Sequence, residues 1–87
     1  MDYHDRFKAL SDSIRLNILD ELNNGEKSAG DIAEKFSLSN SKASYHLAIL
    51  KNVDMVKERK YKNFIFYSLN LNGIEKISVW IDKLLNK

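Results

Sequence analysis

Apolar residues in the first half of the chain recur every three or four positions, the spacing of one face of an α-helix. This spacing predicts helices over residues 3–10 and 39–51, and two more that start at Asp12 and at Ser28. Asp12, Ser28 and Ser39 each carry an oxygen that can accept from the free backbone N–H groups of a first helical turn. Asp31 follows Ser28 at the spacing of a capping box. The first half is therefore predicted to be wholly helical.

After residue 52 the apolar spacing changes to two, and aromatic residues become frequent, which predicts strands. Residues 55–69 are expected to form a two-stranded hairpin, in which Asn63 is the best candidate for a left-handed turn residue. A last helix is expected over about 71–86. Four helices, a hairpin and a helix predict an α+β fold, a winged helix-turn-helix, with residues 1–87 as one domain.

The predicted helix over residues 39–51 has two different faces. One face is apolar and consists of Ala43, Leu47 and Leu50. The opposite face consists of Ser41, Lys42, Tyr45 and Ala48. A buried helix would not place a lysine there, and a merely solvated helix would usually carry more charge. A polar face of low profile is suited to the major groove of DNA, so 39–51 is the predicted recognition helix.

The residue types on this helix and on the hairpin can contact bases and phosphates. An asparagine can pair with adenine, and a lysine can donate to guanine or to phosphate. Cations on a hairpin can follow the DNA backbone or enter a narrow minor groove. The predicted DNA contacts are Ser39, Asn40, Ser41, Lys42, Ser44 and Tyr45 in the helix, and Arg59, Lys60, Lys62 and Asn63 in the hairpin.

The charge distribution supports this placement more than the total charge does. The net charge is only +2, but residues 36–63 hold six basic and two acidic side chains, whereas residues 1–35 hold five basic and eight acidic ones. A positive segment within a nearly neutral chain is typical of a nucleic-acid-binding edge.

The last helix carries apolar residues along one side, as a helix that pairs across a two-fold axis would. An intradomain core helix and an effector pocket are the alternatives for this stripe. We predict that it is a dimer interface, flanked by apolar residues of the first helix. The predicted interface residues are Phe7, Leu10, Ile74, Ile77, Trp80, Ile81 and Leu84.

Other chemistries find little support in the sequence. Cysteine is absent, which excludes a disulfide framework and a thiolate metal site, and the two histidines, His4 and His46, are too few for a metal centre. His46 is expected to be a hydrogen-bonded structural residue, with a phosphate contact as the alternative. Phosphate loops and catalytic triads are not found, so no enzyme, metal or cofactor is expected. Without a signal-like start or a long apolar run, we expect a cytoplasmic protein that does not insert into a membrane.

Three motifs, in the same order along the chain, resemble those of one known family. Leu10–Leu19 is similar to the opening L-S-D-P-T-R-L-x-I-L of the arsenical-resistance (ArsR-type) repressors. Leu38–Leu50 is similar to their recognition helix, L-S-Q-P-x-V-S-x-H-L-x-x-L, and Arg59–Leu69 to their wing. The segments A-G-D-I-A-E-K-F and F-I-F-Y-S-L-N most resemble a metal-independent, sporulation-delay type of autorepressor within that family. The resemblance implies a homodimer that binds an inverted repeat in its own or an adjacent promoter and blocks transcription.

The chain also departs from the family pattern. Ser13 and Ser41 replace prolines, the wing turn lacks its glycine, and the metal-sensing cysteine pair is missing. Two other functions remain open on the sequence: a winged-helix module that binds protein instead of DNA, and a ligand- or metal-responsive sensor. The sequence names no inducing signal and no regulatory protein partner.

Overall fold

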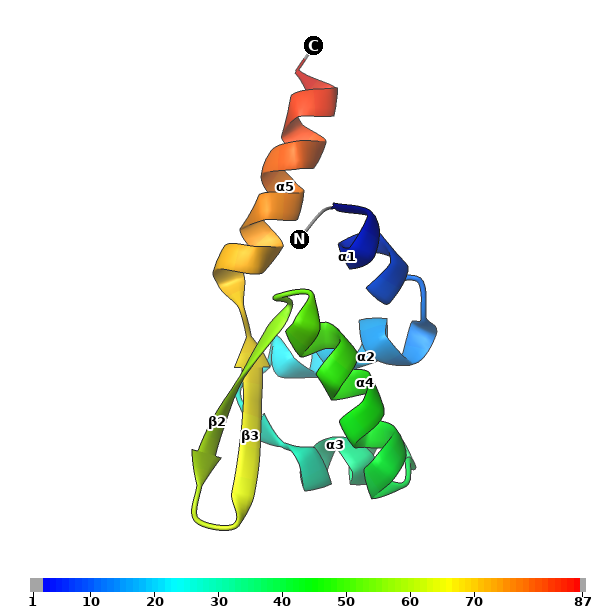
Figure 1. Ribbon diagram of the computed structural model, residues 1–87, viewed down its shortest axis with the longest axis vertical. Helices are drawn as coiled ribbons and strands as arrows, with labels where there is room; N and C mark the ends of the chain where they lie inside the picture. The colour runs from blue at the N-terminus through cyan, green and yellow to red at the C-terminus, as the bar shows by residue number, and fades with distance from the viewer. Residues whose placement is uncertain (1–2, 87) are drawn as a thin grey trace.

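The computed structural model describes residues 3–86, which form five helices and three short strands (Figure 1). In chain order they are α1 (Tyr3–Ala9), α2 (Ser13–Leu22), β1 (Lys27–Ser28), α3 (Ala29–Lys35), α4 (Asn40–Asn52), β2 (Val56–Tyr61), β3 (Phe64–Leu69) and α5 (Leu71–Leu85). The helix-turn-helix pair α3–α4, the hairpin β2–β3 and the last helix confirm the predicted winged helix-turn-helix.

The helices begin where the sequence places their caps. The side chains of Asp12, Ser28 and Ser39 accept hydrogen bonds from backbone N–H groups three residues on, at 3.1, 3.0 and 3.1 Å. Ser28 and Asp31 form the full capping box, because the Asp31 carboxylate also accepts from the Ser28 backbone N–H. These bonds satisfy donors that a helix start would otherwise leave free, so the predicted starts of α2, α3 and α4 are confirmed.

The sheet has one strand more than the sequence predicted. β2 and β3 pair antiparallel, and β1 pairs with the other side of β3, so the order is β1-β3-β2. The prediction of a two-stranded hairpin was therefore incomplete. β1 is only two residues long and leads directly into the cap of α3, so it carries no alternation that a pattern could detect.

The wing turn corrects a second prediction. Tyr61 pairs with Phe64, which leaves Lys62 and Asn63 as a two-residue turn. Lys62, not Asn63, has the positive φ, at 55°. A two-residue hairpin turn must match the right-handed strand twist, and a positive φ at its first central position alone is the sign pattern of a type II′ turn. The first position of the turn therefore takes the positive φ although it is a lysine, and although asparagine at the second position would adopt a positive φ more readily.

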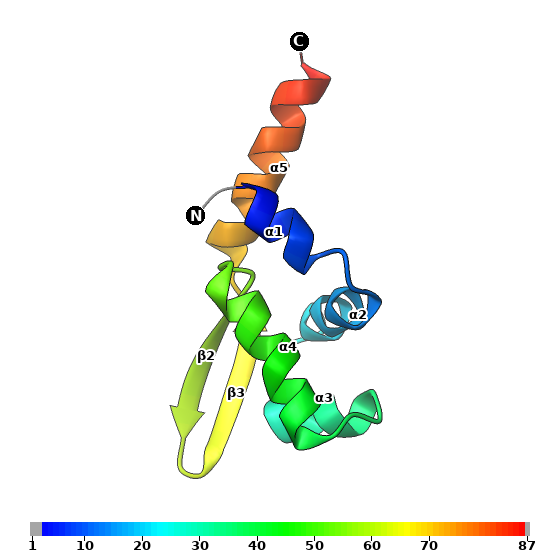
Figure 2. The same cartoon turned by 45° about the vertical axis from the view of Figure 1, so that its right-hand side comes forward.

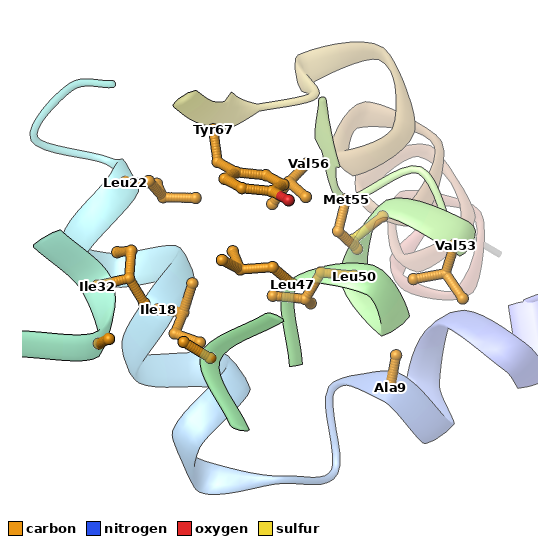
Figure 3. Packing of buried hydrophobic residues seen from close by; sticks show 12 residues of the cluster. Ala9, Ile18, Leu22, Ile32, Leu47, Leu50, Val53, Met55, Val56 and Tyr67 are labelled. Carbon is orange, nitrogen blue, oxygen red and sulfur yellow. The ribbon is translucent and has the colours of Figure 1, made fainter. Parts of the chain in front are cut away.

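The core lies between the helices and the inner face of the sheet (Figure 3). Figure 3 shows Val56 and Tyr67 of the sheet lying over Leu47 and Leu50 of α4. The other core side chains come mainly from α2, α3 and the α4–β2 corner; they are Ile18, Leu22, Ile32, Ala33, Ala43, Val53 and Met55, with Ala9 of α1. The apolar face predicted for the recognition helix is thus buried, which fixes its opposite face toward solvent.

The molecule is elongated, with extents of 47 × 23 × 23 Å. The tip of the wing and the first turn of α4 lie toward one end, and α5 projects from the body at the other end (Figures 1 and 2). α5 starts at the α4–β2 corner, where Gly73 lies so close that a β-carbon there would be 1.7 Å from the Asp54 carbonyl oxygen. The fold therefore separates the predicted DNA-facing end from the predicted dimer helix.

Candidate nucleic-acid interface

The outer face of α4 is open to solvent. Ser41, Lys42 and Ser44 are exposed, and Tyr45 is 59% exposed. The intervening positions on the other face are buried, as predicted; they are Ala43, His46, Leu47 and Leu50. A helix that is anchored by one buried face and turns hydroxyl, ammonium and phenol groups to solvent can enter the major groove of DNA.

The first turn of α4 adds backbone donors to this face. Ser39 caps the helix through the Lys42 N–H, and Asn40 and Lys42 are exposed beside it. α4 is 13 residues long, so its N-terminus carries a partial positive charge from the aligned peptide dipoles. Side chains that can read bases thus lie next to an end of the helix that favours phosphate.

A hollow of about 290 Å³ separates α4 from the tip of the wing. Asn40 and Ser44 of α4 line one side, and Asn63 and Phe64 of the wing line the other. Ser28, Ala29, Gly30 and Ile65 complete the lining, which contains no acidic side chain. The fold therefore brings the predicted helix contacts and a predicted wing contact to one concave surface.

The wing tip, residues 60–65, is exposed along its whole length. Lys60 and Lys62 lie on it, and the Lys62 ammonium is 5.4 Å from the centre of the Tyr61 ring. Arg59 differs from these lysines, because its guanidinium donates to both carboxylate oxygens of Glu26, at 2.8 and 3.2 Å. The pair uses two of the five N–H groups of Arg59, so a DNA contact by Arg59 would have to come from the other three while Glu26 offsets its charge.

His46 is a buried structural residue, as predicted. Its Nδ1 atom lies 3.2 Å from Nη1 of Arg15, whose Nε donates to the Ala9 carbonyl at 2.6 Å. A guanidinium only donates, so Nδ1 of His46 is the acceptor of this hydrogen bond. Asp12 lies 3.8 Å from the same Nδ1. The network ties the α1–α2 corner to the inner side of α4.

Arg6 is a second positioning residue, and the sequence analysis missed it. It is 4% exposed, donates from Nε to the Val53 carbonyl at 3.2 Å, and pairs with Asp54 at 3.7 Å. These contacts join α1 to the end of α4 over 47 positions of sequence. Only the helical spacing of Arg6 with the apolar residues of α1 could have indicated an inward arginine.

The predicted dimer residues divide into three groups. Ile81 and Leu84 of α5 are exposed at 41% and 49%. Trp80 packs on Phe7, with ring centres 5.4 Å apart, and on Tyr3 at 5.6 Å. The remaining predicted residues, Leu10, Ile74 and Ile77, are partly buried and line a mainly apolar groove of about 430 Å³. The other residues of its lining are apolar Leu19, Met55, Leu69 and Ile81 and polar Asp20, Asn23, Ser78 and Asp82. A single chain thus leaves much of the α5 stripe without a covering partner.

Within residues 3–86, His, Asp and Glu nowhere gather in a group of three or more that could hold a metal ion. In the same part of the chain, each helix is too short or too polar to cross a membrane.

Comparison with known proteins agrees with this geometry. A family model described as "Bacterial regulatory protein, arsR family" matches residues 12–58. The chain is 42% identical over 81 residues to the transcriptional repressor SdpR of Bacillus subtilis (strain 168), covering 93% of this chain and 90% of the relative. It is also 37% identical over 76 residues to the arsenical resistance operon repressor of the same organism, with 83% and 72% covered.

Solved structures show the same fold. Reduced HlyU from Vibrio cholerae N16961 matches with a TM-score of 0.76 at 30% identity, over 95% of this chain and 87% of that one. A homodimeric winged helix-turn-helix DNA-binding domain from Mycobacterium bovis matches with a TM-score of 0.78 at 25% identity, over 95% and 77%. Since the family model spans more than half of the chain and the SdpR match spans nearly all of it, the protein belongs to the arsR family of bacterial regulatory proteins.

Proposed function

We propose that this protein is a homodimeric, sequence-specific transcriptional repressor that binds an inverted repeat, in its own or an adjacent promoter. The observation that carries the proposal is the exposed polar face of α4, held outward by a buried apolar face and set beside a basic hairpin. The relatives named as repressors support the same role. A regulator of this kind works in the cytoplasm, where bacterial DNA lies, and catalyses no reaction.

In this proposal α4 reads bases and the wing holds the backbone. Asn40 and Lys42, in the first turn, pair with base edges in the major groove, and the Tyr45 ring contacts a thymine methyl or donates to phosphate. The short hydroxyls of Ser39, Ser41 and Ser44 donate to phosphates or base edges. Lys60, Lys62 and Asn63 follow the backbone or enter the minor groove.

The proposed dimer forms through α5. A second copy would cover the exposed Ile81 and Leu84 and fill the apolar groove beside Ile74 and Ile77. The two α4 helices would then face successive major grooves, with half-sites about 10 base pairs apart. The homodimeric state named for the Mycobacterium bovis domain supports this arrangement.

Binding titrations at several salt concentrations test the proposal. Asn40→Ala and Tyr45→Ala should reduce the preference for the operator over random duplex. A Lys60→Ala, Lys62→Ala double variant should weaken all duplexes alike and lower the salt slope by about 4, because each subunit of the dimer loses two contacts. A Lys76→Ala, Lys83→Ala double variant, which removes two exposed lysines on α5, is the matched control and should leave the slope unchanged. Equal slopes in the wing double variant and the control would contradict the wing contact.

Activation of transcription is the second candidate function. One relative, HlyU of Vibrio cholerae, is named a transcriptional activator and is 32% identical to this chain over 77 residues. A reporter under the protein's own promoter distinguishes the two signs of regulation. Expression that falls when the protein is present agrees with the proposal, and expression that rises indicates an activator. Absence of any duplex binding would instead favour the protein-binding module.

A further inference from the structure

Two ion pairs hold the base of the wing from opposite faces of the sheet. Glu58 and Arg59 are neighbours in β2, so their side chains point to opposite faces. Glu58 accepts from Lys51, in the last turn of α4, at 2.6 Å. Arg59 pairs with Glu26, in the segment before β1, at 2.8 Å. The exposed tip, residues 60–65, begins directly beyond this pair of contacts.

The Arg59 side chain spans the width of the sheet. Phe66 of β3 pairs with Arg59 on one side and with Ser28 of β1 on the other. The guanidinium lies 4.9 Å from the centre of the Phe66 ring and continues to Glu26, two residues before Ser28. Arg59 therefore connects the outer strand β2 to the far edge of the sheet, and its guanidinium group lies over an aromatic ring between them.

The electrostatics agree with a stable pair. The hydrogen bond from Arg59, with a smaller contribution from the charges of Arg59 and Lys57, holds the pKa of Glu26 below its usual range. The same bond raises the pKa of Arg59. This pair occupies the Nε–Nη2 edge of the guanidinium, and the carboxylate charge of Glu26 offsets the attraction of Arg59 for phosphate.

We propose that Arg59 is a positioning residue, and that its pair with Glu26 holds the wing at the angle at which the tip meets DNA, in place of the phosphate contact that its charge suggests. The inference rests on the proposed DNA-binding function and assigns a role within it. A wing fixed before binding has less freedom to lose when Lys60 and Lys62 engage the backbone. The energetic contribution of Arg59 therefore arises within the protein and does not depend on a bond to DNA.

A charge-swap series tests this inference. Arg59→Glu faces Glu26 with a like charge and should weaken duplex binding by up to about fivefold for each subunit, the upper range for an exposed pair. Combining it with Glu26→Arg restores the pair at the wild-type net charge and should return the affinity to within about twofold. The salt slope should be the same in the swapped variant and the wild type, because no phosphate contact is lost.

Arg59→Glu combined with Glu75→Arg is the matched control. It has the same net charge as the swapped variant, but Glu75 is an exposed residue of α5, so the pair with residue 26 is not restored and affinity should not return. Amide ¹⁵N relaxation of residues 60–65 in the DNA-free protein gives a second readout. Arg59→Glu should increase their mobility, and the swap should reverse it.

The salt slope and the mobility of the wing tip distinguish a positioning role of Arg59 from a phosphate contact. If the swapped variant stays weak and its salt slope falls by about 2, one contact for each subunit, Arg59 contacts phosphate and the inference is wrong. Unchanged wing relaxation in Arg59→Glu would also overturn it. If the wild type binds no duplex while the relaxation results hold, the proposed function fails and the positioning role of Arg59 stands.

Discussion

Replacement of Gly73 by alanine is expected to disrupt the junction between α5 and the body. Gly73 lies in the first turn of α5, where its N–H donates to the capping side chain of Asn70. A β-carbon there would be 1.7 Å from the carbonyl oxygen of Asp54 and 2.8 Å from its carbonyl carbon. Both atoms belong to the backbone of the α4–β2 corner, which cannot turn aside as a flexible side chain can.

The expected magnitude follows from the distance. The distance from the new β-carbon to the Asp54 carbonyl oxygen must grow from 1.7 Å to about 3.0 Å, so α5 and the α4–β2 corner must separate by more than 1 Å. Overpacking of this kind costs about 1–3 kcal/mol and occasionally more, against a gain of about 1 kcal/mol when alanine replaces glycine in a helix. Because the clash at 1.7 Å is severe, we expect Gly73→Ala to lower the free energy of unfolding by about 1–2 kcal/mol.

Urea denaturation followed by circular dichroism, at one fixed protein concentration, measures the effect. Gly30→Ala is the matched control, because a β-carbon at Gly30 in α3 meets nothing closer than the Ser28 hydroxyl at 3.8 Å. That variant should be more stable than the wild type by about 0.5–1 kcal/mol. Equal stability of the two variants would refute the packing of α5 against Asp54.

Three further outcomes are expected. Lys62→Gly should be more stable to urea than Lys62→Ala by about 0.5–1 kcal/mol, because only glycine adopts the positive φ of the wing turn without strain; equal stabilities would contradict that geometry. Burial raises the pKa of Tyr67, so the free energy of unfolding should fall as the pH rises above 10.0. Tyr67→Phe should remove that fall. If the free energy of unfolding of the variant still falls over the same pH range, another group causes the fall. Arg6→Met should lower the free energy of unfolding, measured by thermal denaturation, by about 1–3 kcal/mol, since the buried Val53 carbonyl loses its donor. Lys8→Met, at an exposed position of the same helix, is the control and should change this free energy little.

Local signals in the sequence were sufficient for much of the fold. Asp12, Ser28 and Ser39 identify helix starts because capping acts within three residues. The outward face of α4 follows from helical periodicity in the same way. Such features depend on neighbours in the chain, so one sequence contains the information that sets them.

Features that depend on distant residues were not predicted. β1 forms because β3 offers it an edge, and its two residues have no pattern of their own. The pair of Arg59 with Glu26 joins positions 33 apart, and nothing near Arg59 distinguishes it from the lysines of the wing. The wing turn depends on the register of Tyr61 with Phe64, which decided between Lys62 and Asn63. These outcomes require the three-dimensional arrangement.

The central claim is that two copies present the outward face of α4 to adjacent major grooves. Selection of bound duplexes from a randomised pool, by the wild type and by Tyr45→Ala in parallel, tests it most directly. The wild type should enrich a two-fold symmetric sequence with half-sites about 10 base pairs apart, and Tyr45→Ala should enrich it less sharply. Enrichment of no sequence by the wild type, or the same sequence equally by both proteins, would contradict the claim.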